Sequence, residues 1–185
     1  MTSQTRGAAG ERVASPADHK HHHSSTIQGA AEQVAPIGFL PGTLLLTRQG
    51  DRPVEAIQPG DDIISRDFGL VKCHAVDQRI CTARAIWFAA GSLGDTRPEC
   101  AVTLPADQQV LLRDWRAKAM FGQTQALVRA AALVDGEYIR DLGQFEMELT
   151  VLRFNLPLVI YASGLEVAGA PPSRAAMRSS ASPLN

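Results

Sequence analysis

The sequence predicts an all-β domain with short helices, and three observations lead to this fold class. Short apolar runs rich in strand-forming residues recur between residues 43 and 161. Turn signals made of Gly, Pro, Asp and Ser separate these runs. A hydrophobic content of 45% with 5% aromatic residues is typical of a globular domain with a mostly aliphatic core, and 185 residues are enough for one such domain.

Charge and cysteine content narrow the range of partners and sites. Lys and Arg number 18 and Asp and Glu 19, a formal net charge of -1, so no overall field would attract nucleic acid or an anionic membrane. No apolar run reaches the ~18 residues of a membrane span, and no secretory signal is recognised. Cys73, Cys81 and Cys100 lack the short CxxC spacing of a zinc site. We expect a cytoplasmic protein without a nucleic acid or membrane partner.

Both ends of the sequence predict disordered tails, at residues 1–36 and 170–185. They are rich in Ser, Ala, Gly and Pro and lack a sustained apolar period, so they cannot offset the entropy of ordering. The histidines at 19 and 21–23 could hold a transition metal, but a mobile chain offers no fixed ligand geometry. We therefore predict no metal site and no cofactor, and one folded body at residues 37–169.

Residues 38–67 predict strands joined by two tight turns. A strand is predicted over 43–47, and a glycine turn at 49–51 ends it. In the sequence Gln58-Pro59-Gly60-Asp61, proline and glycine occupy the two central positions that fit a type II turn. A new strand is therefore expected to begin near Ile63.

The middle of the chain predicts two further strands and a short helix. Leu70–Gln78 alternates as a strand that exposes His74 in part, which favours a surface residue over a ligand or a base. Residues 85–88 form an apolar strand that runs into a glycine turn. Residues 113–122 combine Trp115, Ala119 and Met120 with a terminal glycine, as in a short helix closed by that glycine.

Several separated phrases of this sequence resemble one known family. Phe39-x-Pro41-Gly42-Thr43 and Val54-Glu55-x-Ile57-x-Pro59-Gly60-Asp61 resemble the start of bacterial Hint domains. The Hint domain is the self-processing fold of inteins and Hedgehog proteins. Ala90-Gly91-x-Leu93-Gly94 continues the likeness in the same order. The resemblance covers residues 38–169 and implies a Hint-type β-fold.

The resemblance also places the end of the domain. An apolar segment at 126–134 would lead to the last two strands, at 147–152 and 156–161, and Ala162–Leu165 would be the exit turn. Pro157 cannot donate a hydrogen bond to a neighbouring strand. The second of these strands should therefore begin at Pro157 or lie at an edge.

The residues that carry chemistry in the family are replaced here. The family domain opens with a cysteine nucleophile, and Gly38 takes its place. A later Ser-Pro-x-His-Arg element supplies a histidine that polarises the scissile peptide, and its positions hold Pro105, Ala106, Gln108 and Gln109. The family's remaining histidine and its Asp-x-His group fall on Val151, Asn155 and Pro157. The resemblance thus predicts no catalytic residue at Gly38, Gln108, Val151, Asn155 or Pro157.

Loss of the first nucleophile predicts loss of the reaction. A Hint reaction begins when a thiol or hydroxyl attacks the preceding carbonyl, and glycine has neither group. We expect a domain that no longer self-processes, is not an enzyme, and binds an unidentified protein or peptide, or serves a structural role. The alternative is an active self-cleaving domain whose nucleophile is not recognised. Thr43 and the three cysteines are the candidates for that role, and their sequence positions disfavour them.

Overall fold

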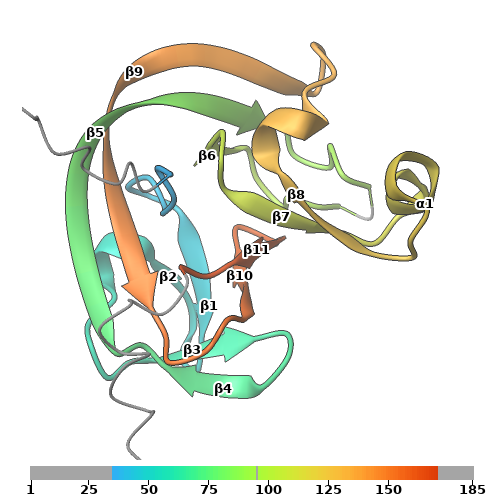
Figure 1. The fold of residues 1–185 in the computed structure, drawn as a ribbon. Helices are drawn as coiled ribbons and strands as arrows, with labels where there is room; N and C mark the ends of the chain where they lie inside the picture. The colour runs from blue at the N-terminus through green and yellow to red at the C-terminus, as the bar shows by residue number, and fades with distance from the viewer. Residues whose placement is uncertain (1–34, 95, 171–185) are drawn as a thin grey trace, which may run out of the picture. The chain divides into compact units, whose positions relative to one another are not determined.

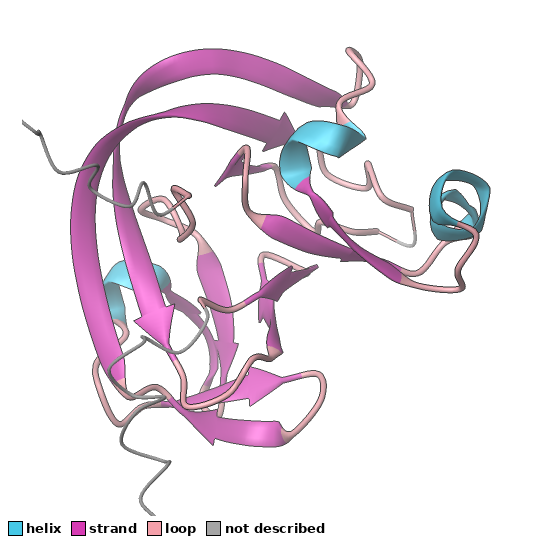
Figure 2. Ribbon diagram, in the orientation of Figure 1, coloured by secondary structure: helices cyan, strands magenta, loops and turns pink. Residues whose placement is uncertain are grey.

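The structure is a computed structural model that describes residues 35–94 and 96–170. The histidine cluster and nearly all of both predicted tails lie outside these ranges. The early elements are β1 (Leu44–Thr47), β2 (Gly50–Pro53), a 3-10 helix (Val54–Ala56), β3 (Asp62–Ser65), β4 (Gly69–Lys72), β5 (Ala75–Phe88) and β6 (Val102–Pro105). The later elements are β7 (Gln109–Leu112), α1 (Trp115–Phe121), β8 (Ala126–Arg129), a 3-10 helix (Ala130–Leu133), β9 (Ile139–Arg153), β10 (Val159–Ala162) and β11 (Leu165–Ala168). The all-β prediction with short helices is confirmed for the described residues (Figure 2).

An eight-stranded antiparallel sheet brings the two ends of the domain together. Its order is β2-β1-β3-β10-β11-β7-β8, and β4 pairs with β3 outside this path. Leu45 of β1 lies opposite Ala162 of β10, so strands far apart in sequence are neighbours in the sheet. Figure 1 shows the blue β1 beside the red β10 and β11. This arrangement places the beginning and the end of the domain on one sheet.

A second, three-stranded sheet has the order β6-β5-β9 and is dominated by one long hairpin. β5 and β9 pair from Ala75 and Arg153 to Phe88 and Ile139, with a register shift between Arg84 and Ile86. Figure 1 shows these two strands curving side by side as a green and an orange ribbon. A bulge of this kind bends a strand and increases its twist, which is consistent with the curvature.

The core is aliphatic, as the composition predicts. Leu45, Ile63, Leu104 and Ile160 are completely buried, and Phe88 packs in the same cluster. Burial of each such side chain contributes about 1.5–3 kcal/mol relative to exposure. The cluster includes residues of both sheets, so their packing holds the end strands in place.

Two local predictions are confirmed in detail. Asp61 N donates to Gln58 O at 3.1 Å and Gly60 has φ of 97°, as a type II turn requires. Gly122 ends α1 with φ of 69°, and its N–H donates to Lys118 O at 3.0 Å. Positive φ at both positions explains why glycine occupies them.

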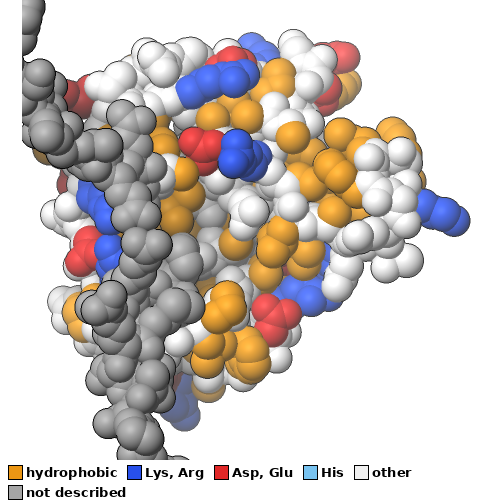
Figure 3. All heavy atoms as spheres, viewed as in Figure 1, with side chains coloured by type: hydrophobic (Ala, Val, Ile, Leu, Met, Phe, Trp, Pro, Cys, Tyr) orange, Lys and Arg blue, Asp and Glu red, His pale blue; other side chains and the backbone are white. Residues whose placement is uncertain are grey.

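The apolar side chains of α1 do not form the buried face that a helix usually presents to a core. Ala117 is its buried residue, whereas Trp115 is 72% exposed and Met120 52% exposed. Figure 3 shows apolar side chains gathered at the right of the view, where α1 lies in Figure 1. The helix is therefore held by its caps and by Ala117. Its Asp114 cap accepts a hydrogen bond from Arg116 N at 2.9 Å.

The prediction of one continuous strand over residues 70–78 is wrong, because two strands share these residues. β4 ends at Lys72 and β5 begins at Ala75. Between them, Cys73 N donates to Asp61 O at 2.9 Å and His74 N donates to Arg153 O at 2.9 Å. The chain thus changes partner strand at this point, and His74 is exposed in the connection and not within a strand.

The last strands also differ from their predicted bounds. β9 begins at Ile139, well before residue 147, and β10 begins at Val159, after Pro157. The predicted exit turn is an internal turn, because β11 follows it and pairs with β10 along its length. Within the described ranges, no helix is long and apolar enough to cross a bilayer.

Candidate functional site

Gly38 lies where the chain enters the fold, in a conformation that only glycine adopts easily. Its φ is 140°, and the following residue is held by two hydrogen bonds, Phe39 N to Thr150 O at 2.9 Å and Thr150 N to Phe39 O at 2.8 Å. A Cβ added to Gly38 would lie 2.9 Å from Thr150 O and 3.1 Å from Val151 Cγ2. The backbone and a side chain of β9 thus fill the place where a nucleophilic side chain would begin.

Gln108 links the beginning of the domain to its end. Its side chain is buried, with 3% exposure for the residue. Oε1 accepts a hydrogen bond from Gly38 N at 2.9 Å, and Nε2 donates to Ala168 O at 2.7 Å. Backbone bonds from Gln108 N to Pro105 O at 3.0 Å and from Ala130 N to Gln108 O at 2.8 Å fix its position. A neutral amide with both groups paired cannot act as a general acid or base.

The structure brings together three of the five positions that the resemblance singled out. Gly38, Gln108 and Val151 are in contact or hydrogen bonded. Asn155 and Pro157 are exposed in the loop between β9 and β10. The resemblance aligned all five with the family's catalytic positions, whereas only the first three lie around the peptide bond before Gly38.

A pocket of ≈ 240 Å³ lies between the incoming and outgoing chain and is named here the junction pocket. Ala35 and Ile37 line it from the incoming side, and Ala168 and Gly169 from the outgoing side; Asp107, Gln108, Gln109 and Arg129 complete it. Arg129 Nη1 and Asp107 Oδ1, 3.6 Å apart, form an ion pair at this pocket. The junction pocket therefore touches both ends of the domain.

A second pocket, of ≈ 300 Å³, shares Gln109, Ala168 and Gly169 with the junction pocket. Its other lining residues are Asp67, Leu127, Pro157, Leu158 and Val159. We name it the apolar pocket, because aliphatic side chains form most of its wall. The two pockets thus share a wall beside the outgoing strand β11.

None of the alternative nucleophiles lines the junction pocket. The Thr43 hydroxyl is buried and donates to Leu40 O at 2.7 Å. Burial raises the pKa of the Cys73 thiol, which donates to Ala75 O at 3.3 Å, and a protonated thiol is a poor nucleophile. Cys81 packs beside the cluster of Ala83, Ala85, Met147 and Leu149, and Cys100 lines a different pocket.

Sequence reasoning missed a buried charge on β11. Glu166 is 2% exposed, and three guanidinium groups surround it. Its carboxylate lies 3.3 Å from Arg66 Nε, 3.6 Å from Arg97 Nη1 and 2.6 Å from Arg113 Nε. We name these four residues the arginine cluster. A glutamate within the apolar run Leu165–Ala168 was the available signal, because glutamate is almost never buried unless paired.

No group of three His, Cys, Asp or Glu residues that could hold a metal ion occurs in the part of the chain that the structure describes. The interactions present around Gly38 and the junction pocket are the hydrogen bonds of Gln108 and the Arg129–Asp107 ion pair.

Comparison with solved structures found several similar chains. The chain is similar to the gp41-1 intein in its crystal structure, at 13% identity and a TM-score of 0.47, over 71% of this chain and 98% of that one. It is similar to a bacterial intein-like domain from Clostridium thermocellum, at 14% identity and a TM-score of 0.47, over 72% of this chain and 98% of that one. The MchDnaB-1 intein is 14% identical with a TM-score of 0.46, over 71% of this chain and 99% of that one.

No curated protein matches this chain. The family model of the Hint domain matches residues 37–170, which are most of the sequence and include β1 to β11. The chain therefore belongs to the Hint domain family.

Proposed function

We propose that this Hint domain has lost self-processing and acts as a binding module that keeps its incoming and outgoing segments side by side. The observation that carries the proposal is the close approach of β9 to Gly38. A Cβ added to Gly38 would lie 2.9 Å from Thr150 O. A nucleophilic side chain cannot be placed at residue 38 without movement of β9. Without that nucleophile, the covalent reaction has no first step.

The surroundings of Gly38 support the same conclusion. Gln108 accepts from Gly38 N through an amide oxygen that carries no proton and has no pKa near neutrality. Loss of a general acid or base alone would reduce a rate by about 10²–10⁴. Loss of the nucleophile as well leaves only hydrolysis by water.

Binding would use the junction pocket and the apolar pocket. Their shared wall of Gln109, Ala168 and Gly169 lies beside the outgoing strand. An extended segment of a protein or peptide partner fits such a place, since aliphatic side chains can enter the apolar pocket and polar groups can meet Gln109 and the Arg129–Asp107 pair. Gln108 would meanwhile hold the two ends of the domain at a fixed separation.

Intact-mass measurement of the full chain tests the loss of processing. The protein is incubated for days with dithiothreitol or with hydroxylamine, reagents that release a thioester or ester. We expect a single species of the full mass in both reagents and in buffer alone. A fragment that begins at Gly38 and accumulates faster with either reagent would favour the alternative, an active domain with an unrecognised nucleophile.

A second measurement tests the binding role separately from the loss of processing. Ala168→Trp should fill the shared wall of both pockets, and Ala119→Trp on the exposed face of α1 is the matched control. Loss of peptide capture from a display library by the first variant alone supports the binding role. Equal capture by both variants, with intact folding, would contradict it.

A further inference from the structure

The three-stranded sheet leaves part of one edge of β9 without a neighbouring strand. β9 is the last strand in the order β6-β5-β9, so β5 covers only one of its two edges. On the other edge the incoming chain forms a bridge between Phe39 and Thr150 and then continues into β1. Within the described residues, no other bridge or strand lies on this edge between Gln144 and Leu149. We name residues 144–149 the free edge.

The backbone groups of Glu146 and Glu148 point out from the free edge. Phe39 and Thr150 exchange two hydrogen bonds, at 2.9 and 2.8 Å, so the N–H and C=O groups of Thr150 face away from β5. In an antiparallel ladder, every second residue of a strand directs these groups to the same edge. Glu146 and Glu148 alternate with Thr150 along β9 and therefore share its orientation.

The neighbouring strand β5 supports this alternation. Arg84 lies opposite Gln144 in the ladder, and its carbonyl faces away from β9, because it accepts from Ala106 N at 2.8 Å. The register runs without a shift from this pair to Thr150, so the phase is the same at both ends. A strand edge whose N–H and C=O groups lack a partner strand is a template for another strand.

The side chains of the free edge are acidic on one face and apolar on the other. Glu146 and Glu148 are exposed on the same face of β9, and neither side chain forms an ion pair or a hydrogen bond with the described residues. On the opposite face Met147 is buried, and Leu40 packs against its cluster. A strand added here has two carboxylates beside one of its faces and apolar groups beside the other.

We propose that the free edge binds an extended segment of a partner protein as an added antiparallel strand, and that this segment carries Lys or Arg at two alternate positions. Main-chain hydrogen bonds to Glu146 and Glu148 hold it, in the direction in which Phe39 already pairs. Opposite charges directly across a sheet stabilise the pairing. The residue between the two basic ones lies beside Met147, which favours an apolar side chain. The free edge shares no residue with the junction pocket, so this inference goes beyond the proposed function.

Charge argues against a second copy of this chain as the added strand. Two copies paired antiparallel about Met147 set Glu146 of one copy opposite Glu148 of the other. Like charges directly opposite one another destabilise a sheet. The two glutamates that attract a basic segment therefore repel another β9.

Amide hydrogen exchange, followed by NMR on the ¹⁵N-labelled full chain, tests the free edge residue by residue. In the protein alone we expect slow exchange at Met147, whose N–H faces β5, and fast exchange at Glu146 and Glu148. A blocked Thr-Lys-Val-Lys-Thr peptide, at about ten times its Kd, should slow exchange at the two glutamates about tenfold. The same peptide with N-methyl groups on its lysines keeps the charge but loses the donors that face β9. It should bind about tenfold more weakly.

The role of charge is tested with the double variant Glu146→Gln and Glu148→Gln. Its affinity for the peptide should fall about fivefold, because two cross-strand charge pairs are lost. The control is the double variant Glu99→Gln and Glu137→Gln, which removes the same charge from two exposed residues outside the strands and should leave the affinity unchanged. A thermal melt of each variant reports folding.

Three results would overturn the proposal. Slow exchange at Glu146 and Glu148 in the protein alone would show that the edge is already covered. Its dependence on protein concentration then distinguishes a second copy from another part of the same chain. Equal binding of the methylated and unmethylated peptides would show attraction by charge without strand addition. Equal affinity in the two double variants would show that the edge does not select basic side chains.

Discussion

The junction pocket and the arginine cluster each depend on one buried polar side chain, but the two side chains differ in charge and in the kind of partner that they bind. Gln108 is neutral, and the oxygen and nitrogen atoms of its amide group are both hydrogen bonded within the fold. Glu166 is a carboxylate, and its three guanidinium partners outnumber it. In the first region one side chain makes two hydrogen bonds to the backbone, whereas in the second one carboxylate forms three ion pairs.

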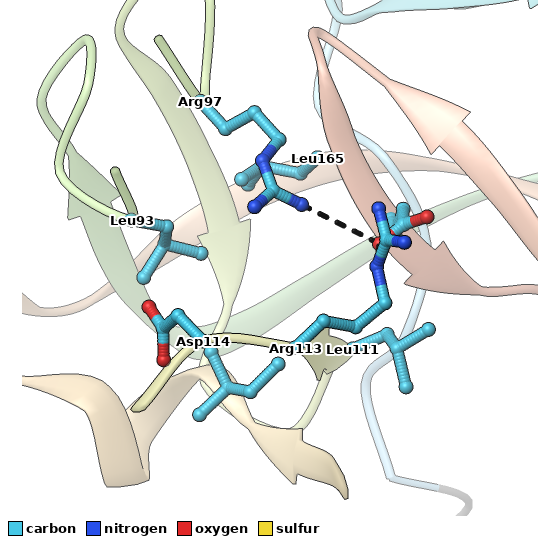
Figure 4. A pocket seen from close by; sticks show the side chains of 8 residues that line it. Leu93, Arg97, Leu111, Arg113, Asp114 and Leu165 are labelled. Atoms are coloured by element: carbon cyan, nitrogen blue, oxygen red, sulfur yellow. Dashed lines mark hydrogen bonds and ion pairs between the residues drawn. The ribbon is translucent and has the colours of Figure 1, made fainter. Parts of the chain in front are cut away.

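This difference shows that the domain holds its two buried polar side chains in different ways. Around Gly38 the hydrogen bonds of Gln108 and Phe39 join the incoming chain to β9 and β11. Around Glu166 the guanidinium groups of three separate segments meet at one buried carboxylate, and Figure 4 shows two of these arginines. Two positions that carry catalysis in the family's pattern, Gly38 and Gln108, are thus hydrogen bonded to each other here, and the buried charge of Glu166 lies elsewhere, on β11.

The largest effect is expected from removal of the charge on Glu166. Glu166→Gln keeps the shape of the side chain but leaves three arginines without their shared buried partner. Breaking such a buried group costs about 3 kcal/mol or more in the free energy of unfolding, at the low end of the usual range because the arginines are partly hydrated. Urea unfolding measures this loss.

Asp62→Asn is the matched control for Glu166→Gln. Asp62 pairs with Lys72 at 3.0 Å and Arg48 at 3.6 Å near the surface, where ion pairs contribute about 0–1 kcal/mol. Similar losses in the two variants would remove the distinction between the arginine cluster and an ordinary surface pair.

A smaller loss is expected when the family's nucleophile is restored. Gly38→Cys should lower the free energy of unfolding by about 2–3 kcal/mol, since positive φ is strained for cysteine and its Cβ would crowd Thr150 O. Gly42→Cys also has positive φ, 82°, but meets nothing within 4 Å, so about 1 kcal/mol is expected. Urea unfolding and intact mass with dithiothreitol give both readouts. An unstrained Gly38→Cys variant that cleaves before residue 38 would show that the catalytic geometry persists.

The smallest of the three losses is expected at Gln108. Gln108→Ala removes the acceptor of Gly38 N and the donor to Ala168 O. We expect a loss of about 1–2 kcal/mol, because water in the junction pocket can hydrate part of what is left. Gln109→Ala, on the neighbouring exposed side chain, should change stability by less than about 0.5 kcal/mol. Equal unfolding curves for the two alanine variants would mean that the Gln108 link contributes little.

The parts of the fold that depend on residues close together in sequence were predictable. The turn at Gln58–Asp61 and the helix end at Gly122 depend on residues close in sequence, and both were predicted correctly. The length of β5 and β9 was not, because their outer residues carry no strict alternation. Ile80 is 73% exposed on this hairpin, and the pairing of the two strands depends on contacts 50 or more residues apart.

The candidate site was predictable only in outline. The resemblance located Gly38 and Gln108, but nothing in the sequence indicates that the amide of Gln108 would bind both Gly38 and Ala168. Glu166 was missed because its partners Arg66, Arg97 and Arg113 come from three separate segments. A buried charge can be suspected from one apolar run, but its partners can be found only once the chain is folded.

The span of a single glutamine side chain separates Gly38, on the incoming chain, from Ala168, on the outgoing chain. Domains with adjacent ends tolerate insertion and circular permutation. This domain could therefore be placed inside a surface loop of a host protein without forcing the host's strands apart. It could also be closed between residues 37 and 169 by a linker of a few residues, with new ends opened in the exposed turn at residues 122–125.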